Sequence, residues 1–201
     1  MIWIDGVLVS PGEGGVVYGE RMLQGYRIWD PYRSKLSALY HLGTGVELRP
    51  EMRVLYLGAA HGTTVSHVAD YVDTVYAVEI APRPTQDLLE VARDRRNVVP
   101  ILADATRPQE YAPLVESVDL IYQDVAHPDQ AEIALRNQPF LKERGQLILV
   151  LKTRSVDVAA PPEKVAEMAA DILTARYAIL ARAWLFPYHK DHAAFICEAL
   201  K

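Results

Sequence analysis

The clearest chemical signal in the chain is a glycine turn between an apolar run and a helical pattern. The apolar run Arg53–Leu57 ends at Gly58. Gly62 follows, and Thr63 and Thr64 then open the helical pattern. Glycine lets the backbone approach a ligand closely, while threonine hydroxyls can cap a helix or bind a polar group. The stretch therefore predicts a strand, a tight turn and a helix N-terminus, which together form the nucleotide-binding unit of an α/β sheet.

Acidic side chains stand at the ends of the next three apolar runs. Glu79 ends the first, Asp104 follows the second, and Asp124 ends the third. A carboxylate at the position of Glu79 can accept hydrogen bonds from both hydroxyls of a ribose. The acid and the backbone amides at Asp104 and Ala105 can bind an adenine edge. Because the carboxyl ends of parallel strands meet at one edge of a sheet, these groups should converge on one ligand.

The glycine spacing narrows the choice of that ligand. Gly-x-x-x-Gly differs from the Gly-x-Gly-x-x-Gly of dinucleotide sites, so a pyrophosphate is not the expected guest. S-adenosylmethionine fits the combination of glycine turn, ribose acid and adenine acid better. A single acid at a strand end is more often an ordinary turn or cap residue. Three such acids in register with a glycine turn favour a binding site.

Composition limits the remaining possibilities. A chain of 201 residues that is 50% hydrophobic can bury one substantial core. Cys197 is the only cysteine and the six histidines lack the spacing of a metal motif, so we expect neither a disulfide nor a metal site. No apolar stretch approaches the roughly 20 residues of a membrane span, and no leader pattern opens the chain. We therefore expect a cytoplasmic protein without a membrane partner.

The charge is acidic overall but unevenly distributed. A net charge of −5 argues against a protein that holds nucleic acid by bulk positive potential. Basic residues nevertheless gather between Arg21 and Lys35, and acidic residues between Asp104 and Asp129. This polarity could steer a phosphate chain toward one side of the molecule, although a solvated surface explains it almost as well.

The pattern divides the chain into two parts. Residues 1–28 predict a small β appendage: a hairpin around Asp5-Gly6, a glycine-rich loop, and β-rich runs at Val16–Tyr18 and Tyr26–Trp29. Residues 29–201 predict the main domain, in which strands and helices alternate. The expected helices lie near residues 34–43, 63–71, 84–95, 108–116, 128–141 and 162–175. The class is α/β, a doubly wound and mainly parallel sheet, with an antiparallel pair of strands near residues 177–186 and 193–198.

Six separated motifs in this order carry a family resemblance. They are Tyr26-Arg-Ile-Trp-Asp-Pro-Tyr-Arg-Ser-Lys-Leu36, Leu55-Tyr-Leu-Gly-Ala-Ala-His-Gly-Thr-Thr-Val-Ser-His67, Asn97-Val-Val-Pro-Ile-Leu-Ala-Asp-Ala-Thr106, Gln123-Asp-Val-Ala-His-Pro128, Leu151-Lys-Thr-Arg-Ser155 and Lys190-Asp-His192. The chain from about residue 16 onward resembles fibrillarin in its archaeal form. The N-terminal β region is shorter than is usual for that family, and His127 stands where its pattern has Gln.

The resemblance implies a Rossmann-like class I methyltransferase fold and an S-adenosylmethionine-dependent RNA 2′-O-methyltransferase acting on rRNA and tRNA. It also implies three partners: a box C/D guide RNA that pairs with the substrate RNA, a Nop-domain scaffold protein, and a kink-turn-binding ribosomal-type protein.

The resemblance also assigns the site residues. The implied catalytic set is Lys35, Asp124, Lys152 and His192. The implied cofactor-binding set is Gly58, Ala59, Gly62, Thr63, Thr64, Glu79, Ile80, Asp104, Ala105, Asp124, Val125, Ala126 and His127.

The chemistry gives each catalytic residue a role. A ribose hydroxyl is a poor nucleophile, so an enzyme must align it with the methyl group and help it lose its proton. Lys152 ends an apolar run, where desolvation could lower the pKa of its ammonium, and is expected to orient and activate the hydroxyl. Asp124 is expected to hold Lys152 and face the methyl group, while Lys35 and His192 position the hydroxyl and its flanking phosphate.

Ordinary structural roles remain open for each of the four residues. Lys35 could face solvent on its helix, and Asp124 could be a turn residue. Lys152 could extend its stem along the sheet end, and His192 could bind a loop.

Two other functions also remain open: a small-molecule O-methyltransferase on the same fold, and a non-catalytic structural subunit. The first would need a metal site or an apolar lid, which the sequence does not clearly show. The intact glycine turn argues against the second.

Overall fold

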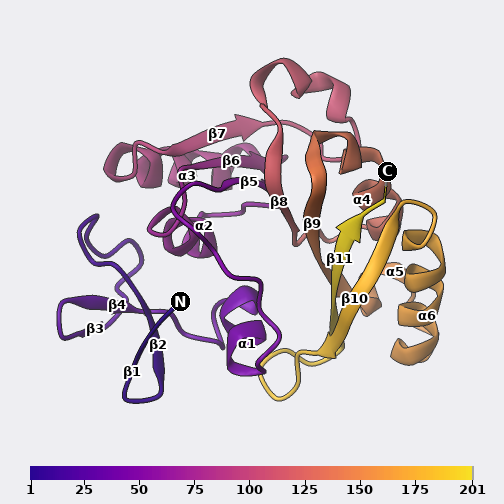
Figure 1. The fold of residues 1–201 in the computed structure, drawn as a ribbon, viewed down its shortest axis with the longest axis horizontal. Helices are drawn as coiled ribbons and strands as arrows, with labels where there is room; N and C mark the ends of the chain where they lie inside the picture. The colour runs from indigo at the N-terminus through magenta and orange to yellow at the C-terminus, as the bar shows by residue number, and fades with distance from the viewer. Residues whose placement is uncertain (201) are drawn as a thin grey trace.

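Seven strands form the central sheet of the molecule, in the order β10-β11-β9-β8-β5-β6-β7 (Figure 1). The computed structural model describes residues 1–200. Neighbouring strands from β9 to β7 run parallel, whereas β11 pairs antiparallel with β9, and β10 with β11. The strands are β5 (Arg53–Leu57), β6 (Thr74–Glu79), β7 (Val98–Leu102), β8 (Val118–Gln123), β9 (Leu141–Lys152), β10 (Tyr177–Trp184) and β11 (His192–Ala199). The α/β class, the parallel sheet and the antiparallel C-terminal pair are as the sequence predicts.

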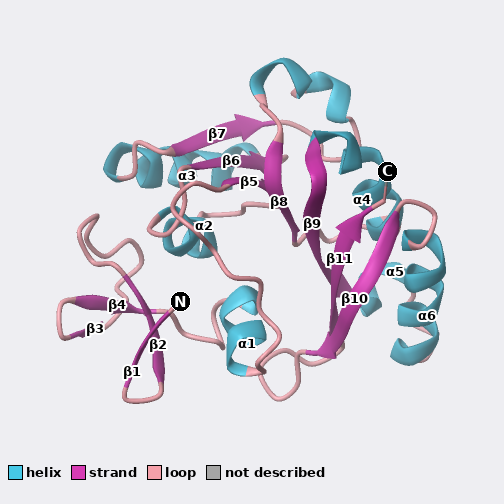
Figure 2. Cartoon of the chain, viewed as in Figure 1, coloured by secondary structure: helices cyan, strands magenta, loops and turns pink. Residues whose placement is uncertain are grey.

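Helices pack on both faces of this sheet (Figure 2). Strand β5 shows why: Val54 and Tyr56 point into one buried apolar cluster, whereas Leu55 and Leu57 point into the other. Alternate residues of a strand face opposite sides, so a strand that is apolar throughout needs cover on both. The helices are α1 (Lys35–His41), α2 (Thr63–Ala69), α3 (Pro82–Asp94), α4 (Gln130–Asn137), α5 (Thr153–Val156) and α6 (Pro162–Leu173). Within residues 1–200, no helix is long and apolar enough to cross a membrane.

Two predicted helices differ from the structure, in each case at a proline. The helix expected at 108–116 is two 3-10 turns, η1 (Pro108–Glu110) and η2 (Ala112–Leu114). Proline donates no backbone hydrogen bond, so Pro113 prevents a continuous α-helix. The helix expected at 128–141 ends at Asn137, passes through the 3-10 turn η3 (Gln138–Phe140) around Pro139, and gives way to β9. The short helix α5 was not predicted.

A separate four-stranded antiparallel sheet forms the N-terminal part of the chain. It has the order β1-β2-β4-β3, with β1 (Ile2–Ile4), β2 (Val7–Ser10), β3 (Met22–Leu23) and β4 (Tyr26–Ile28). Asp5 and Gly6 both have positive φ, as a tight hairpin turn requires. The β-rich run Val16–Tyr18 is not a strand. Its amides at Val17 and Tyr18 donate to the Glu20 carboxylate, at 2.8 and 3.0 Å, instead of to a neighbouring strand.

A buried ionic network attaches this N-terminal sheet to the main sheet's helices. Arg27 in β4 is fully buried and pairs with Asp70 at the end of α2 at 2.8 Å and with Glu20 at 3.2 Å. Arg95, after α3, pairs with the same Asp70 at 2.9 Å and donates to the carbonyl groups of the loop at residues 14–15. Two arginines therefore share one carboxylate between the two sheets. The division of the chain into domains at residue 28 stays a prediction.

His67 lies beside this network in the core. Its ring stacks on Trp29 with ring centroids 5.0 Å apart and planes 8° apart, and its Nδ1 lies 2.7 Å from the Ser10 hydroxyl. Burial, together with the nearby charges of Arg27 and Arg95, lowers the pKa of His67 to about 2. The folded protein therefore holds His67 neutral at pH values at which the unfolded chain protonates it.

Acid should accordingly destabilise the protein through His67. The contribution is fully present above pH 6.5 and is lost as the pH falls, because only the unfolded state then gains a proton. We expect the free energy of unfolding to decrease by up to about 1.4 kcal/mol per pH unit from this group alone. Urea denaturation between pH 7.5 and 5 measures the slope. His67→Gln should flatten it, and an equal slope in wild type and variant would contradict the assignment.

Candidate active site

The glycine turn after β5 packs against the end of β8 at the carboxyl edge of the sheet. Gly58 has a φ of +80°, and a Cβ there would lie 2.8 Å from the backbone oxygen of Asp124. Gly62 has a φ of +84°, and its Cβ would meet Leu88 of α3 at 2.8 Å. Both positions therefore require glycine, for backbone conformation as well as for space.

The carboxylate of Glu79 is fixed by the same turn. Its Oε2 accepts from the amide of Ala60 at 2.8 Å, and its Oε1 accepts from the amide of Ala81 at 2.8 Å. The residue is 9% exposed. Each carboxylate oxygen keeps a further lone pair, so Glu79 can accept two more hydrogen bonds from a ligand in front of the turn.

A cavity of about 350 Å³ lies at this edge of the sheet, within the size range of small-molecule sites. Nine of the residues in the predicted cofactor set line it: Gly58, Glu79, Ile80, Asp104, Ala105, Asp124, Val125, Ala126 and His127. The cavity thus collects the ends of strands β5, β6, β7 and β8, as expected for an open α/β sheet.

Four other residues of the predicted cofactor set do not line this cavity. Ala59 is buried and its amide donates to Val78 of β6. Gly62 packs on α3. The Thr63 and Thr64 side chains do not cap α2, whose N-cap residue is Gly62, and the Thr64 hydroxyl donates to Ser34 at 3.0 Å. These residues shape the turn rather than the cavity wall. Lys152 of the predicted catalytic set also lines the cavity, and the sequence analysis missed five lining residues: Ala60, Val78, Ala103, Thr106 and Ile133.

Asp104 and His127 both line the cavity. The Oδ1 atom of Asp104 accepts from the Thr106 amide at 2.8 Å. Burial alone would raise the pKa of Asp104, but the bonds from Thr106 and the charge of Arg107 outweigh it and lower the pKa. Asp104 is therefore a carboxylate at neutral pH. The Asp129 amide donates to Nδ1 of His127 at 3.0 Å, which leaves the Nε2 edge of the ring as a hydrogen-bond donor.

Asp124 joins two lysines at the mouth of the cavity. Its Oδ2 lies 2.9 Å from Nζ of Lys35, and its Oδ1 lies 2.9 Å from Nζ of Lys152. The Lys152 ammonium also donates to the backbone oxygen of Asp124 at 2.9 Å. These side chains are 13 to 20% exposed, so both ammonium groups are held in place yet reach the surface.

Buried glutamines hold the backbone of Lys152. Gln130 at the start of α4 accepts from the Lys152 amide at 2.9 Å and donates to its carbonyl at 3.1 Å. Gln123 in turn donates to the Gln130 carbonyl at 2.7 Å. Both glutamines are fully buried. This clamp was not predicted from the sequence, because a glutamine is usually exposed and its partner lies in a distant strand.

His192 lies beside Lys152 in the register of β11 and β9. Its Nδ1 lies 2.6 Å from the Lys190 carbonyl, so Nδ1 carries the proton and Nε2 has a free lone pair. Burial lowers the pKa of His192, and the charges of Lys35 and Lys152 oppose its protonation further. A second histidine, His189, was not predicted. Its ring lies 5.9 Å from His192, and burial and Lys35 lower its pKa too.

Two buried tyrosines lie near Asp124. Tyr56 and Tyr122 are buried, with ring centroids 4.7 Å apart. Burial raises the pKa of both hydroxyl groups well above the ordinary value, and the charge of Asp124 acts in the same direction. Both rings therefore stay neutral, and the charge at the site belongs to Asp124 and its lysines. Within residues 1–200, no group of three His, Cys, Asp or Glu side chains is placed to hold a metal ion.

Comparison with known proteins agrees with this geometry. The sequence profile of the family described as fibrillarin matches residues 7–201. The chain belongs to the fibrillarin family. A fibrillarin-like rRNA/tRNA 2′-O-methyltransferase of Methanoculleus marisnigri is 70% identical, with 98% of each chain covered. The fibrillarin-like enzyme of Archaeoglobus fulgidus is 46% identical, over 94% of this chain and 91% of the other.

Solved fibrillarin structures have the same fold. The fibrillarin in a fibrillarin/Nop5p complex superimposes with a TM-score of 0.94 at 44% identity, over 98% of this chain and 96% of the other. Aeropyrum pernix fibrillarin, solved with natively bound S-adenosyl-L-methionine, superimposes with a TM-score of 0.85 at 41% identity, over 95% and 87%. The family membership inferred from the six sequence motifs is confirmed.

The cavity makes a direct prediction about cofactor affinity. Because Glu79 and Asp104 both line the cavity with carboxylates, Glu79→Ala and Asp104→Ala should each weaken S-adenosylmethionine binding by about 1–3 kcal/mol. Isothermal titration calorimetry measures the loss, and thermal unfolding checks that the variants fold. Glu167→Ala, at an exposed position of α6, serves as control. Unchanged affinity in both cavity variants would mean that the cofactor binds elsewhere.

Proposed function

We propose that this fibrillarin-family protein transfers a methyl group from S-adenosylmethionine to ribose 2′-hydroxyls of rRNA and tRNA. The observation that carries the proposal is Asp124, held between two lysine ammonium groups at the mouth of a cofactor-sized cavity. The names of the relatives and the bound cofactor in the Aeropyrum pernix structure support it.

The residues of the cavity fit the proposed cofactor. Glu79 offers two oriented oxygens to a ribose diol, and Asp104 with the adjoining amides offers acceptors and donors to an adenine edge. Ile80 and Val125 supply apolar contacts for the base. When bound, S-adenosylmethionine would supply an electrophilic methyl group on a sulfonium leaving group.

The lysine–aspartate–lysine arrangement would position the ribose. Lys35 and Lys152 flank the carboxylate of Asp124, so a hydroxyl entering between them meets donors on two sides. Asp124 would orient both ammonium groups and carry the negative charge that faces the methyl group. Holding the hydroxyl in line with the methyl group is the larger part of the catalytic task. Lys152, clamped by Gln130, is the best candidate for orienting it.

His192 would accept or relay the proton of the hydroxyl. Its lowered pKa keeps the ring neutral at pH 7, and its Nε2 lone pair is free. A neutral histidine beside two ammonium groups can take up a proton only transiently, which suits a general base. The Lys35 and Lys152 ammonium groups are fixed by Asp124 and still partly exposed, so they can contact a substrate as well as stabilise the fold.

A small-molecule O-methyltransferase is the alternative function. It would need a closed pocket or a metal beside the acceptor. The lysines here are partly exposed at the mouth of the cavity, so a large acceptor has direct access. This geometry favours RNA.

The partners follow from the same proposal. The relative solved as a complex with Nop5p supports a Nop-domain scaffold protein for this chain. A box C/D guide RNA and a kink-turn-binding ribosomal-type protein complete the proposed assembly. The guide would select the nucleotide by pairing with the substrate, which agrees with an acidic enzyme that holds RNA by local contacts only. A cytoplasmic location belongs to this proposal as well.

Lys152 tests the mechanism most directly. Lys152→Ala should keep the fold and the cofactor affinity but lose methyl transfer by on the order of 10²-fold or more, the cost of a misplaced hydroxyl. Lys152→Arg should also be slow, because a guanidinium is bulkier and cannot hold the hydroxyl in the same position. Single-turnover methylation by the assembled, saturated complex measures both.

Lys164→Ala, at an exposed position of α6, is the matched control and should turn over normally. If both Lys152 variants turn over within a few-fold of wild type, Lys152 has a structural role. The hydroxyl would then be handled by alignment, or by Lys35 and His192.

Dependence on partners gives a further test. With a net charge of −5, the isolated chain should bind RNA weakly and without sequence preference. We expect site-specific methylation only after a guide RNA and both partner proteins are added, as measured with labelled cofactor. Robust, site-specific methylation by the chain alone would refute this part of the proposal.

A further inference from the structure

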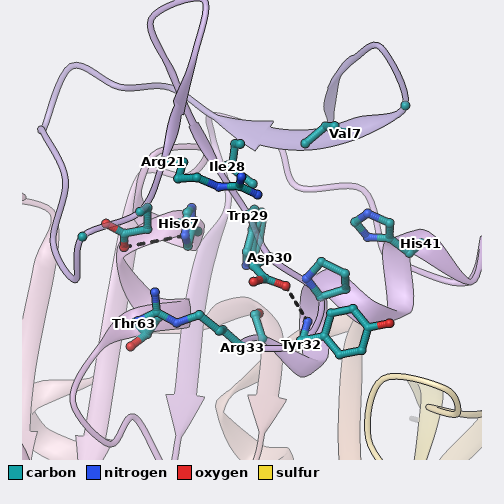
Figure 3. Close-up of a pocket in the computed structure, with 15 residues that line it drawn as sticks. Val7, Arg21, Ile28, Trp29, Asp30, Tyr32, Arg33, His41, Thr63 and His67 are labelled. Carbon is teal, nitrogen blue, oxygen red and sulfur yellow. Dashed lines mark hydrogen bonds and ion pairs between the residues drawn. The ribbon is translucent and has the colours of Figure 1, made fainter.

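A second and larger cavity, of about 540 Å³, lies between the N-terminal sheet and the main domain. Figure 3 shows Arg21 above Asp30 and Arg33 below it, on opposite sides of the opening. Trp29 and His67 lie at the back, and Tyr32 stands at one end. We call this cavity the N-terminal groove. It shares no lining residue with the cavity at the carboxyl edge of the sheet, although Thr63 of the predicted cofactor set lines it.

Neither arginine of the groove has a carboxylate partner in the part of the chain that the structure describes. Within residues 1–200, no ion pair involves Arg21, and the Arg33 guanidinium only approaches the Tyr18 carbonyl, at 3.4 to 3.5 Å. The arginines that do pair with acids are Arg27, Arg49, Arg53, Arg93, Arg95, Arg107, Arg144 and Arg154. In an acidic protein, two unpaired guanidinium groups facing one cavity leave room for an anion.

The acids of the groove do not cancel this charge. Glu20 is bound by Arg27 and by the amides of Val17 and Tyr18, and its side chain is 5% exposed. The same bonds lower the pKa of Glu20 to about 2 against the opposing effect of burial. Asp30 remains, and its Oδ1 accepts from the Tyr32 amide at 2.8 Å. The groove therefore has two free guanidinium groups against one free carboxylate.

The groove adjoins the start of α1. Ser34 lines the groove and is the N-cap residue of α1, and the next residue is Lys35, whose ammonium binds Asp124. The Thr64 hydroxyl also donates to Ser34, so this turn is anchored to the glycine-turn helix α2. The groove and Asp124 are therefore linked through two consecutive residues, Ser34 and Lys35.

We propose that the N-terminal groove binds backbone phosphates of the substrate RNA strand next to the methylated nucleotide, with Arg21 and Arg33 as the phosphate ligands. This inference rests on the function proposed above. The cavity is far larger than a single phosphate, and the Tyr32 ring at its end is 64% exposed, which suits a ribose or base beside the phosphate. Arginine guanidinium groups bind phosphate through paired hydrogen bonds and position a strand without reading its sequence.

In this proposal the N-terminal sheet positions one of the two phosphate-binding arginines. Val7 and Ile28 of that sheet form one wall of the groove, and Arg21 immediately precedes β3. The buried pairs of Arg27 fix this wall relative to the main domain. The sheet thereby holds Arg21 opposite Arg33.

The test compares arginine variants in the fully assembled complex with a guide-paired RNA substrate. Arg21→Ala and Arg33→Ala should each raise the KM for the RNA about tenfold, the scale of a charged hydrogen bond to phosphate, and leave kcat within about twofold. Each should also lower the slope of log KM against log salt by about one. Arg21→Lys and Arg33→Lys should restore the salt slope but only part of the affinity, because a lysine keeps the charge and loses the paired hydrogen bonds.

Arg176→Ala is the matched control, because Arg176 is exposed and immediately precedes β10, which lies on the other side of the molecule from β1 to β4 in Figure 1. It should leave the KM, the salt slope and kcat unchanged. Calorimetry with S-adenosylmethionine and thermal unfolding should give wild-type values for both groove variants, since neither residue touches the cofactor cavity.

A chemical change in the RNA locates the contact. Single phosphates on either side of the target nucleotide are replaced by neutral methylphosphonates. At the contacted phosphate, the replacement should raise the wild-type KM by the same factor as an arginine variant. It should add nothing further to the Arg21→Ala/Arg33→Ala double variant, because coupled partners are not additive. Equal added losses at every phosphate would overturn the proposal.

Two other results would also overturn it. One is an unchanged KM and salt slope in both alanine variants. The other is failure of the variants to assemble with the scaffold protein in gel filtration, which would make the groove a protein interface. RNA affinity measured by fluorescence anisotropy in the same complex needs no turnover. An assembly that binds RNA through the groove but transfers no methyl group would therefore refute the proposed function and leave the groove standing.

Discussion

The carboxylate of Asp124 is the group on which the arrangement of the site depends. It stands at the end of β8, in the middle of the sheet, and balances ammonium groups from α1 and from β9. Removing it would leave two lysines, each mostly shielded from water, in mutual repulsion. The sheet can bring these segments together because parallel strands end at one edge, and helices on both faces keep that edge open. The cofactor cavity, the lysines and the histidines are different parts of one layer of strand ends.

A second ionic centre, Arg27 with Asp70 and Arg95, performs a different task at the other side of α2. It contains no group that reaches solvent, so its contribution is to fix the N-terminal sheet and not to bind a ligand. A buried charged pair is weak evidence for net stability, because desolvation offsets most of the attraction. Its geometric effect is clearer, since two arginines from distant segments can satisfy one carboxylate in only one relative placement. The short N-terminal sheet thus acts as a rigid wall.

The sequence predicted those features that depend on local pattern and on strand ends. The strands at Thr74–Glu79 and Val118–Gln123 follow from continuous apolar runs, and the convergence of Glu79, Asp104 and Asp124 follows from parallel pairing. Predictions of secondary structure from local pattern were wrong where a single residue outweighed the strand or helix propensity of its neighbours. Glu20 captures the amides that would have made Val16–Tyr18 a strand, and Pro113 interrupts the expected helix. The Gln130 clamp and the N-terminal groove were out of reach, because their parts meet only through tertiary packing.

The position of Gly58 determines how a substitution there would affect ligand affinity and turnover. The atom that a side chain there would strike is the backbone oxygen of Asp124, the same oxygen that receives the Lys152 ammonium. A methyl group at residue 58 would thus push on the acid that joins the lysines while it crowds the ligand cavity. A side chain at residue 58 should therefore reduce ligand affinity and turnover together, because both losses come from the same steric contact with Asp124. The geometry of the glycine turn and the geometry of Asp124 with its lysines therefore depend on each other.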